Sequence, residues 1–192
     1  MTERKTNKKN EKSKVTTFPV PFTLEGINEN ITVNTNTHSR EQIINQAFQF
    51  HRQGNISEAA KYYQYFINQG FNDHRVFSNY GAILQNNGKS KDAELSLRKA
   101  INLKPDYANS YLILASVLED LDKLKEAELS VRKAIQIKPD FAEAHYKLGN
   151  TLKDKGKLIE AELSIRKAIK LNPELINAYT SLGKVLKVLE ES

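Results

Sequence analysis

The stretch AELSLRKAINLKPDYA, residues 93–108, occurs twice more in this chain with small changes. It returns as AELSVRKAIQIKPDFA at 127–142 and as AELSIRKAIKLNPELI at 161–176, and each copy starts 34 residues after the last. A divergent copy, AAKYYQYFINQGFNDH, begins at Ala59. Similarity at a fixed period of about 20–50 residues is typical of a repeat protein, in which each unit packs only on its neighbours.

The period divides the chain into a leader, residues 1–39, and a repeat region, residues 40–192. The repeat region contains four full units and a half unit, which are 40–73, 74–107, 108–141, 142–175 and 176–192.

Each unit has the pattern of two helices joined by a tight turn. In the fourth unit, apolar residues three or four apart form one stripe on each helix, Gly156 lies at the turn, and Pro173 ends the second helix. Small residues recur where two helices would approach closely. The positions that we expect to define the repeat are Gly81, Ala93, Ala100, Pro105, Ala127, Ala134, Pro139, Gly149, Gly156, Ala161, Ala168, Pro173 and Gly183.

Polar residues at the expected helix starts predict caps. Ser39 and Gln42 have the spacing of a capping box that opens the first helix. Asp106 and Asp140 each follow a proline, and we expect them to cap the next helix.

This pattern resembles the tetratricopeptide repeat family, over residues 40–192. The resemblance implies an all-α, right-handed superhelical solenoid of antiparallel helix pairs, with first helices on the concave face and second helices on the convex back. The leader and divergent first unit also resemble the repeat arms that precede glycosyltransferase-like or sulfotransferase-like domains in some bacterial proteins.

The leader has a composition that favours disorder, because it holds few aliphatic residues. Its first 14 residues hold six Lys or Arg against two Glu, and asparagine is frequent further on. The segment FPVPFTL, residues 18–24, alternates apolar residues with prolines. We interpret it as a linker or, alternatively, as a short docking peptide.

Composition excludes several kinds of chemistry. The chain has no Cys, which rules out disulfides, thiol nucleophiles and cysteine-ligated metals. Its four histidines, at positions 38, 51, 74 and 145, do not have metal-ligand spacing, and no nucleotide-binding or nucleophile motif occurs. We therefore predict a protein that is not an enzyme, with no catalytic, cofactor-binding or metal-binding residues. No secretory signal or membrane-spanning run occurs, so we expect a cytoplasmic location without membrane insertion.

The net charge of +6 includes an Arg-Lys pair on the second helix of three units. Glu94, Glu128 and Glu162 each precede the Arg by four residues, so we interpret these pairs as intrahelical and structural. Nucleic acid is not expected as a partner, and binding to it or to an anionic surface is a minor alternative.

A leucine recurs on the far side of the same helices, at Leu95, Leu129 and Leu163. We expect partial burial of this row against neighbouring helices; the alternative is an exposed contact patch. The half unit places Leu182, Val185, Leu186 and Leu189 on one stripe. This arrangement suits a C-terminal capping helix with a polar outer face, and the alternative is an end that pairs with another chain.

The concave face is the binding surface that the resemblance implies. The inward-facing candidates are Asn45, Asn79, Asn109, Ser116, Lys147, Asn150 and Lys184. We therefore predict a non-enzymatic protein-interaction scaffold that binds extended peptides or partner proteins. The alternative is a substrate-recruiting arm that acts in trans with a transferase enzyme.

Overall fold

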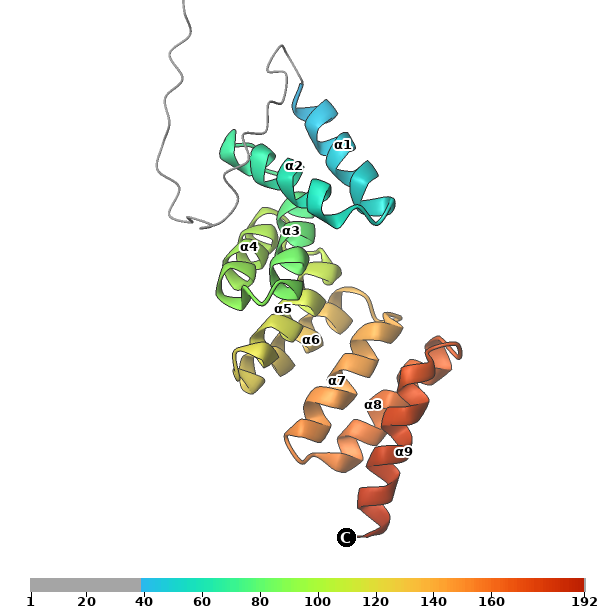
Figure 1. The fold of residues 1–192 in the computed structure, drawn as a ribbon. Coiled ribbons are helices and arrows are strands. Elements are labelled where there is room, and N and C mark those ends of the chain that lie inside the picture. Colours follow the sequence, from blue (N-terminus) through green and yellow to red (C-terminus); the bar gives the residue numbers. More distant parts are fainter. Residues whose placement is uncertain (1–38, 192) are drawn as a thin grey trace, which may run out of the picture. The chain divides into compact units, whose positions relative to one another are not determined.

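The computed structural model describes residues 39–191. The predictions for the leader up to residue 38, including the FPVPFTL segment, lie outside this range. The described residues form nine α-helices and no strand, as predicted (Figure 1). The helices are α1 Arg40–Arg52, α2 Ile56–Asn68, α3 His74–Asn86, α4 Ser90–Leu103, α5 Ala108–Asp120, α6 Leu124–Ile137, α7 Ala142–Asp154, α8 Leu158–Leu171 and α9 Ile176–Glu190.

Each helix packs mainly on its neighbours in the chain, which confirms a solenoid of helix pairs. Within a pair, the first helix packs along the second, and the second helix also packs on the first helix of the next pair. From α3 onward, successive odd-numbered helices also touch one another. No comparable contact joins successive even-numbered helices of the described part, so the odd-numbered helices lie on the inner side of the curve.

The turn between the two helices of each pair contains one residue with a positive φ, in the left-handed backbone conformation. Gly156 adopts φ +72° at the turn between α7 and α8, as predicted. Asp122 replaces glycine in the third unit and adopts φ 58° there, a conformation that an L-residue enters at some cost. The structure therefore keeps the same turn geometry even where the sequence lacks glycine.

The prolines lie just after the second helices, as predicted. The last helical residues are Leu103, Ile137 and Leu171, two positions before a proline in each case. The residue between them is extended, with φ −146° and ψ 90° at Lys104, because the proline ring disfavours a helical conformation in the residue before it.

Of the three predicted helix caps, one is correct and two are wrong. The capping box at Ser39 is confirmed, since its hydroxyl accepts from the Gln42 N–H at 3.3 Å and its own N–H donates to Gln42 Oε1 at 2.8 Å. The predicted caps at Asp106 and Asp140 are wrong. The N-cap residues are Tyr107 and Phe141, neither of which caps through its side chain. The tight turn after each proline leaves both aspartates exposed, one residue before the cap.

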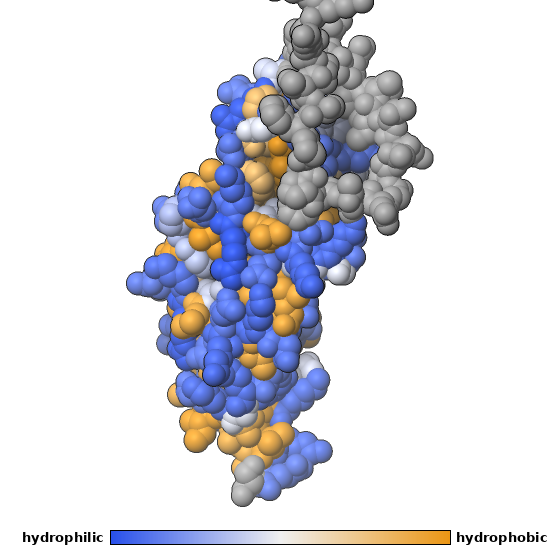
Figure 2. Space-filling view, turned by 90° about the vertical axis from the view of Figure 1, so that its left-hand side faces the viewer, coloured by the Kyte–Doolittle hydropathy of each residue, from blue (hydrophilic) through white to orange (hydrophobic). Residues whose placement is uncertain are grey.

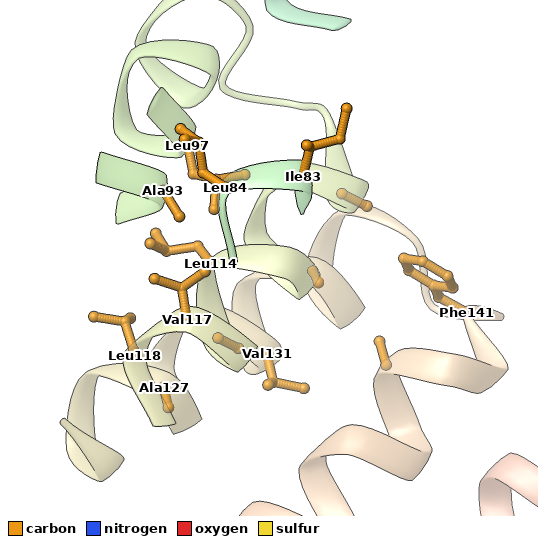
Figure 3. Packing of buried hydrophobic residues seen from close by; sticks show 14 of the residues in the cluster. Ile83, Leu84, Ala93, Leu97, Leu114, Val117, Leu118, Ala127, Val131 and Phe141 are labelled. Atoms are coloured by element: carbon orange, nitrogen blue, oxygen red, sulfur yellow. The ribbon is translucent and has the colours of Figure 1, made fainter. Parts of the chain in front are cut away.

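The core is a continuous series of apolar layers between successive helices. Figure 3 shows part of it, with Leu84 of α3, Leu97 of α4, Leu114 and Val117 of α5 and Val131 of α6 arranged in succession. The alanines expected to define the repeat are all fully buried; they are Ala93, Ala100, Ala127, Ala134, Ala161 and Ala168.

Two glycines allow the closest approach of paired helices. A Cβ at Gly81 would lie 2.7 Å from Leu97 Cγ, and one at Gly149 would lie 2.4 Å from Ile165 Cγ1. Both distances are shorter than carbon atoms tolerate, so the second helix of each pair occupies the space that a larger residue would need.

Helix α9 packs on α8 through most of its predicted apolar stripe. Of its predicted stripe only Val185 is fully buried, while Leu182, Leu186 and Leu189 are half-buried. Ile176 is 77% exposed, and a Cβ at Gly183 would meet nothing within 4 Å. The predicted stripe therefore faces the core, and the outer face of α9 is largely polar, with Ile176, Tyr179 and Val188 as its exposed apolar residues.

Candidate interaction surfaces

The seven candidate binding residues all lie on the odd-numbered helices, with one or two on each helix from α1 to α9. The structure divides them into residues held by other side chains and residues left open.

Asn79 belongs to the first group. Its Nδ2 donates to the hydroxyl of Tyr63 at 3.1 Å, and that hydroxyl lies 3.0 Å from His51 Nδ1. Burial raises the pKa of Tyr63, which keeps the phenol neutral and able to hydrogen-bond. The amide oxygen of Asn79 makes no hydrogen bond within the described residues, so one side of this amide is fixed and the other can accept.

Lys147 is also held. Its Nζ forms an ion pair with Glu119 of α5, and the other oxygen of Glu119 accepts from the Thr151 hydroxyl at 2.6 Å. Sequence reasoning missed Glu119, because its partner lies 28 residues away on the next first helix. The pair joins α5 to α7 across the inner face, so Lys147 contributes to its structure as well as to its charge.

Asn150 lies one turn further along α7 and, unlike Lys147, is not held by another side chain through its carbonyl oxygen. Its Oδ1 is buried and has no hydrogen-bond partner in the described part of the protein. Ser116 holds the equivalent position on α5 and is half-buried. An unpaired buried acceptor costs about 1–3 kcal/mol, so a donor that reaches Asn150 would be bound favourably.

The remaining candidates are open. Asn45 and Lys184 are exposed, at opposite ends of the row of inner helices. Asn109 is exposed, and its Nδ2 lies 3.5 Å from the Tyr107 hydroxyl. The structure does not bring these three residues together, so they can act only on a ligand that extends along the inner face.

The outer face carries the predicted Glu-to-Arg pairs, and all three are confirmed. The distances between guanidinium and carboxylate are 2.8 Å for Arg98–Glu94, 2.9 Å for Arg132–Glu128 and 2.7 Å for Arg166–Glu162.

The structure adds bridges between repeats that the sequence pattern does not show. Arg98 also pairs with Glu126 at 2.9 Å, and Lys123 pairs with Glu94 at 2.8 Å. Lys155, the C-cap residue of α7, pairs with Glu128 of α6 and so joins the third repeat to the fourth. The hydrogen bond from Lys123, helped by Arg98, holds the pKa of Glu94 below its usual value.

The leucine row also lies on the outer face, and the prediction of partial burial is wrong. The exposed fractions are 54% for Leu95, 68% for Leu129 and 64% for Leu163. These residues face away from the inner helices, and successive even-numbered helices are too far apart to cover them.

His145, one of the histidines considered as a possible metal ligand, lies instead against a backbone carbonyl group. His145 Nε2 lies 2.9 Å from the Pro139 carbonyl oxygen, and the Tyr179 hydroxyl, one repeat later, donates to the Pro173 carbonyl at 3.0 Å. Between residues 39 and 191, no three His, Asp or Glu side chains come together in a metal-binding arrangement. Among the described helices, none is both long and apolar enough to cross a bilayer.

Comparisons with known proteins agree with this geometry. Models of the tetratricopeptide repeat match residues 74–107 and 142–175, and a further model, described as a TPR repeat, matches 123–156. None of the curated protein sequences matches the chain.

Several solved structures have the same fold. A crystal structure of MamA is 26% identical with a TM-score of 0.66, and the match covers 75% of this chain and 84% of that one. YrrB, described as a TPR protein with an unusual peptide-binding site, is 19% identical with a TM-score of 0.66, over 82% and 81% of the two chains.

The first TPR domain of Spaghetti (RPAP3), bound to the HSP90 peptide SRMEEVD, is 22% identical with a TM-score of 0.59, and the match covers 61% of this chain and 93% of that one. The likeness to YrrB and Spaghetti concerns the fold. Together with the repeat matches at 74–107 and 123–175 and the helix-pair geometry, it shows that residues 39–191 form a solenoid like those of tetratricopeptide repeat proteins.

Proposed function

We propose that this protein is a non-enzymatic interaction scaffold that binds an extended peptide, or an extended segment of a partner protein, along its inner face. The observation that carries this proposal is the unpaired Oδ1 of Asn150 on α7, which a rotation of this half-buried side chain would present to a backbone N–H of the ligand. The open amide oxygen of Asn79 offers a second acceptor two repeats away.

The arrangement suits a ligand that is recognised through its backbone. Asparagine amides both donate and accept, so they can bind peptide groups without reading a side-chain sequence. Lys147 is neutralised by Glu119, which removes one of the cations that an acidic C-terminal peptide would need. Two structurally similar proteins, YrrB and Spaghetti, are described with a peptide-binding site or a bound peptide, which supports this class of ligand.

Selection of peptides from a random library on the full-length chain tests the proposal. For a selected peptide, N150A is expected to weaken binding about tenfold, because it removes a hydrogen bond to a buried group. Asn102→Ala on α4 is the matched control, since Asn102 is exposed on the outer face. Equal effects of the two substitutions, or no effect of either, would contradict binding along the inner face.

The role as a recruiting arm for a transferase stays a prediction. The family models that match describe repeats only. Co-purification of the full chain with a glycosyltransferase or sulfotransferase is the measurement that would support it.

A further inference from the structure

The outer side of the solenoid contains a groove that the proposed function of the inner face does not use. Helices α6 and α8 each pack on α7, and the described residues show no comparable contact between α6 and α8. The space between these two helices forms a groove of about 490 Å³. Its apolar surface comes from Ile135 of α6, Leu148 of α7 and Leu163 of α8, and Leu163 is 64% exposed. A ligand can therefore bury an apolar side chain in this groove.

The groove is also lined by a histidine where the neighbouring repeats have a larger ring. The equivalent residues one repeat before and one repeat after His145 are Tyr111 and Tyr179. His145 Nε2 lies 2.9 Å from the Pro139 carbonyl oxygen, so this nitrogen is the donor and Nδ1 of the neutral ring is an acceptor. The smaller ring leaves space beside α6 and α8 and also offers an acceptor to a ligand.

The charged residues that line the groove are positive. Arg132 and Lys167 are among the lining residues, and none of the described lining residues is acidic. Arg132 is already paired with Glu128 and Glu160, whereas no carboxylate of the described residues forms an ion pair with Lys167. Other lysines of α6 and α8 also lack such a pair, but they do not line the groove. An acidic group next to the apolar surface would therefore meet a cation that is not yet neutralised.

The polar groups of the groove can pair with a peptide backbone. Gln136 Oε1 accepts from Lys133 Nζ at 3.0 Å, and Gln136 Nε2 makes no hydrogen bond within the described residues. This Nε2 can donate to a peptide carbonyl. Ser164 Oγ donates to the Glu160 carbonyl at 2.9 Å, so its lone pairs can accept a peptide N–H. Donors and acceptors together suit a peptide better than a small molecule that offers only a carboxylate.

The extent of the apolar surface limits the size of the ligand. In Figure 2, the apolar patches on the face shown are separate and surrounded by hydrophilic residues. The groove has a similar mixture, with three aliphatic residues among its eight lining residues. One large apolar side chain with acidic neighbours matches this surface. A long apolar segment would place most of its side chains over polar groups.

We infer that the groove between α6 and α8 binds a short acidic segment of a partner protein that contains one large apolar residue. The apolar side chain packs beside Leu163 and Ile135, and a neighbouring carboxylate pairs with Lys167. The backbone of the segment bonds to Gln136 and Ser164. The groove is separate from the inner face, so its test does not depend on the function proposed above.

The test is an NMR titration of the isotope-labelled full-length chain with an end-blocked peptide, Gly-Glu-Phe-Glu-Gly. Blocking removes the terminal charges, so only the two glutamates can pair with a lysine. One control peptide has alanine in place of phenylalanine, and another has lysine in place of both glutamates. We expect shift changes at the residues that line the groove. We also expect an affinity at least about fivefold higher than that of either control peptide, because each control lacks one of the two contacts.

Two single variants locate the site. Leu163→Ser is expected to weaken binding of the peptide about tenfold through lost apolar burial. Lys167→Glu is expected to weaken it about threefold or more and to reduce its dependence on salt. Both residues are exposed, so circular dichroism melts should match the parent protein. Leu95→Ser and Lys99→Glu are the matched controls, because they change the same repeat positions on α4, outside the groove, and they should bind as the parent does.

His145→Tyr tests the space in the groove. Tyrosine is compatible with this position of the repeat, since the Tyr179 hydroxyl makes the equivalent hydrogen bond to the Pro173 carbonyl at 3.0 Å. The larger ring should occupy part of the groove and weaken binding of the peptide at least about fivefold. A variant that folds and binds as tightly as the parent would contradict a site lined by His145.

Other results would also overturn the inference. Equal affinity for the three peptides, or unchanged binding by Leu163→Ser, would show that the groove does not select an acidic apolar segment. Phenylpropionate that binds as tightly as the peptide would make the groove a site for small carboxylates. Binding of phosphatidylserine vesicles through Leu163 and Lys167, without binding of the peptide, would make it a lipid contact. Self-association that Leu163→Ser abolishes in sedimentation experiments would make it an interface between copies.

Discussion

The first repeat and the three full repeats after it fill the same positions in different ways. Tyr63 and Phe66 of α2 are fully buried where α4 has Leu97 and Ala100. Phe71 takes the place of Pro105, and its ring centroid lies 5.3 Å from that of Phe66. The first repeat therefore packs through tilted and edge-to-face aromatic rings, whereas the later repeats pack through small residues and branched aliphatics.

The difference changes how a repeat is joined to the next one. Because alanine has no bulk, α4 packs on α5 along much of its length, and the pairs Arg98–Glu126 and Lys123–Glu94 bridge the two repeats outside the core. Helix α2 touches α3 over a shorter contact. The first repeat thus gains most of its stability within itself, and the later repeats share theirs with their neighbours.

The largest expected effect comes from breaking the aromatic packing. Phe66→Ala should cost about 3–5 kcal/mol, because it leaves a cavity beside Phe71. Hydrogen exchange should show the loss of protection in α1 and α2 while α7 and α8 keep theirs, since α2 is weakly joined to α3.

Leu118→Ala in α5 is the comparison for a central repeat. It should cost about 2–5 kcal/mol and reduce protection in the helices on both sides. If Phe66→Ala lowered protection equally throughout the solenoid, the proposed independence of the first repeat would be wrong.

A smaller effect is expected where the glycine position of the repeat is filled. Gly149→Ala should cost about 1–3 kcal/mol, because the added Cβ meets Ile165 and the Ala161 carbonyl oxygen. Thermal unfolding measures this loss. Gly183→Ala is the matched control at the equivalent position of α9, and it should gain up to about 1 kcal/mol from helix propensity. A loss at both positions would show that backbone conformation, rather than packing, requires the glycine.

The smallest effect concerns the bridges between repeats. Glu128→Gln should cost about 1 kcal/mol, because the buried carboxylate binds both Arg132 of its own helix and Lys155 of the next repeat. Among the described residues, Glu162 forms an ion pair with Arg166 alone, so Glu162→Gln should cost about 0.2–0.5 kcal/mol. Urea unfolding of the two variants compares the costs, and equal values would argue against a contribution from the bridge.

The same bridges predict a dependence on pH. The hydrogen bond from Lys155, with that from Arg132, lowers the pKa of Glu128 from its usual 4.5. A carboxyl group with a lowered pKa stabilises the folded state above its unfolded pKa, and this contribution disappears as the pH falls through the folded pKa. The parent should therefore lose stability below about pH 4.5 more steeply than Glu128→Gln does. Parallel pH profiles of the two proteins would contradict this assignment.

Much of the fold could be predicted because the residues that recur in each repeat determine local features such as turns and helix ends. Gly156 fixes a turn, Pro173 ends a helix, and the capping box at Ser39 opens one through contacts between residues three apart. The prediction for Asp106 failed because cap geometry depends on how the chain leaves the proline, and one residue is enough to move a side chain off the helix end.

The candidate sites were harder to predict because their properties depend on contacts between repeats. The period placed Asn79, Lys147 and Asn150 on the first helices of their repeats. It did not reveal that Tyr63 holds Asn79 or that Glu119 holds Lys147. Those partners lie 16 and 28 residues away, on other helices.

The sequence by itself determined the helix pairs, their turns and their order, because a period of 34 residues leaves each unit only its neighbours to pack on. The tertiary structure alone decided which surfaces are open. Curvature brings the odd-numbered helices together and separates the even-numbered ones, so the same leucine pattern that could have been partly buried is exposed on the outer face. It also left Gly183 uncovered and Asn150 unpaired, because exposure and pairing depend on neighbouring helices rather than on a residue's place in its own repeat.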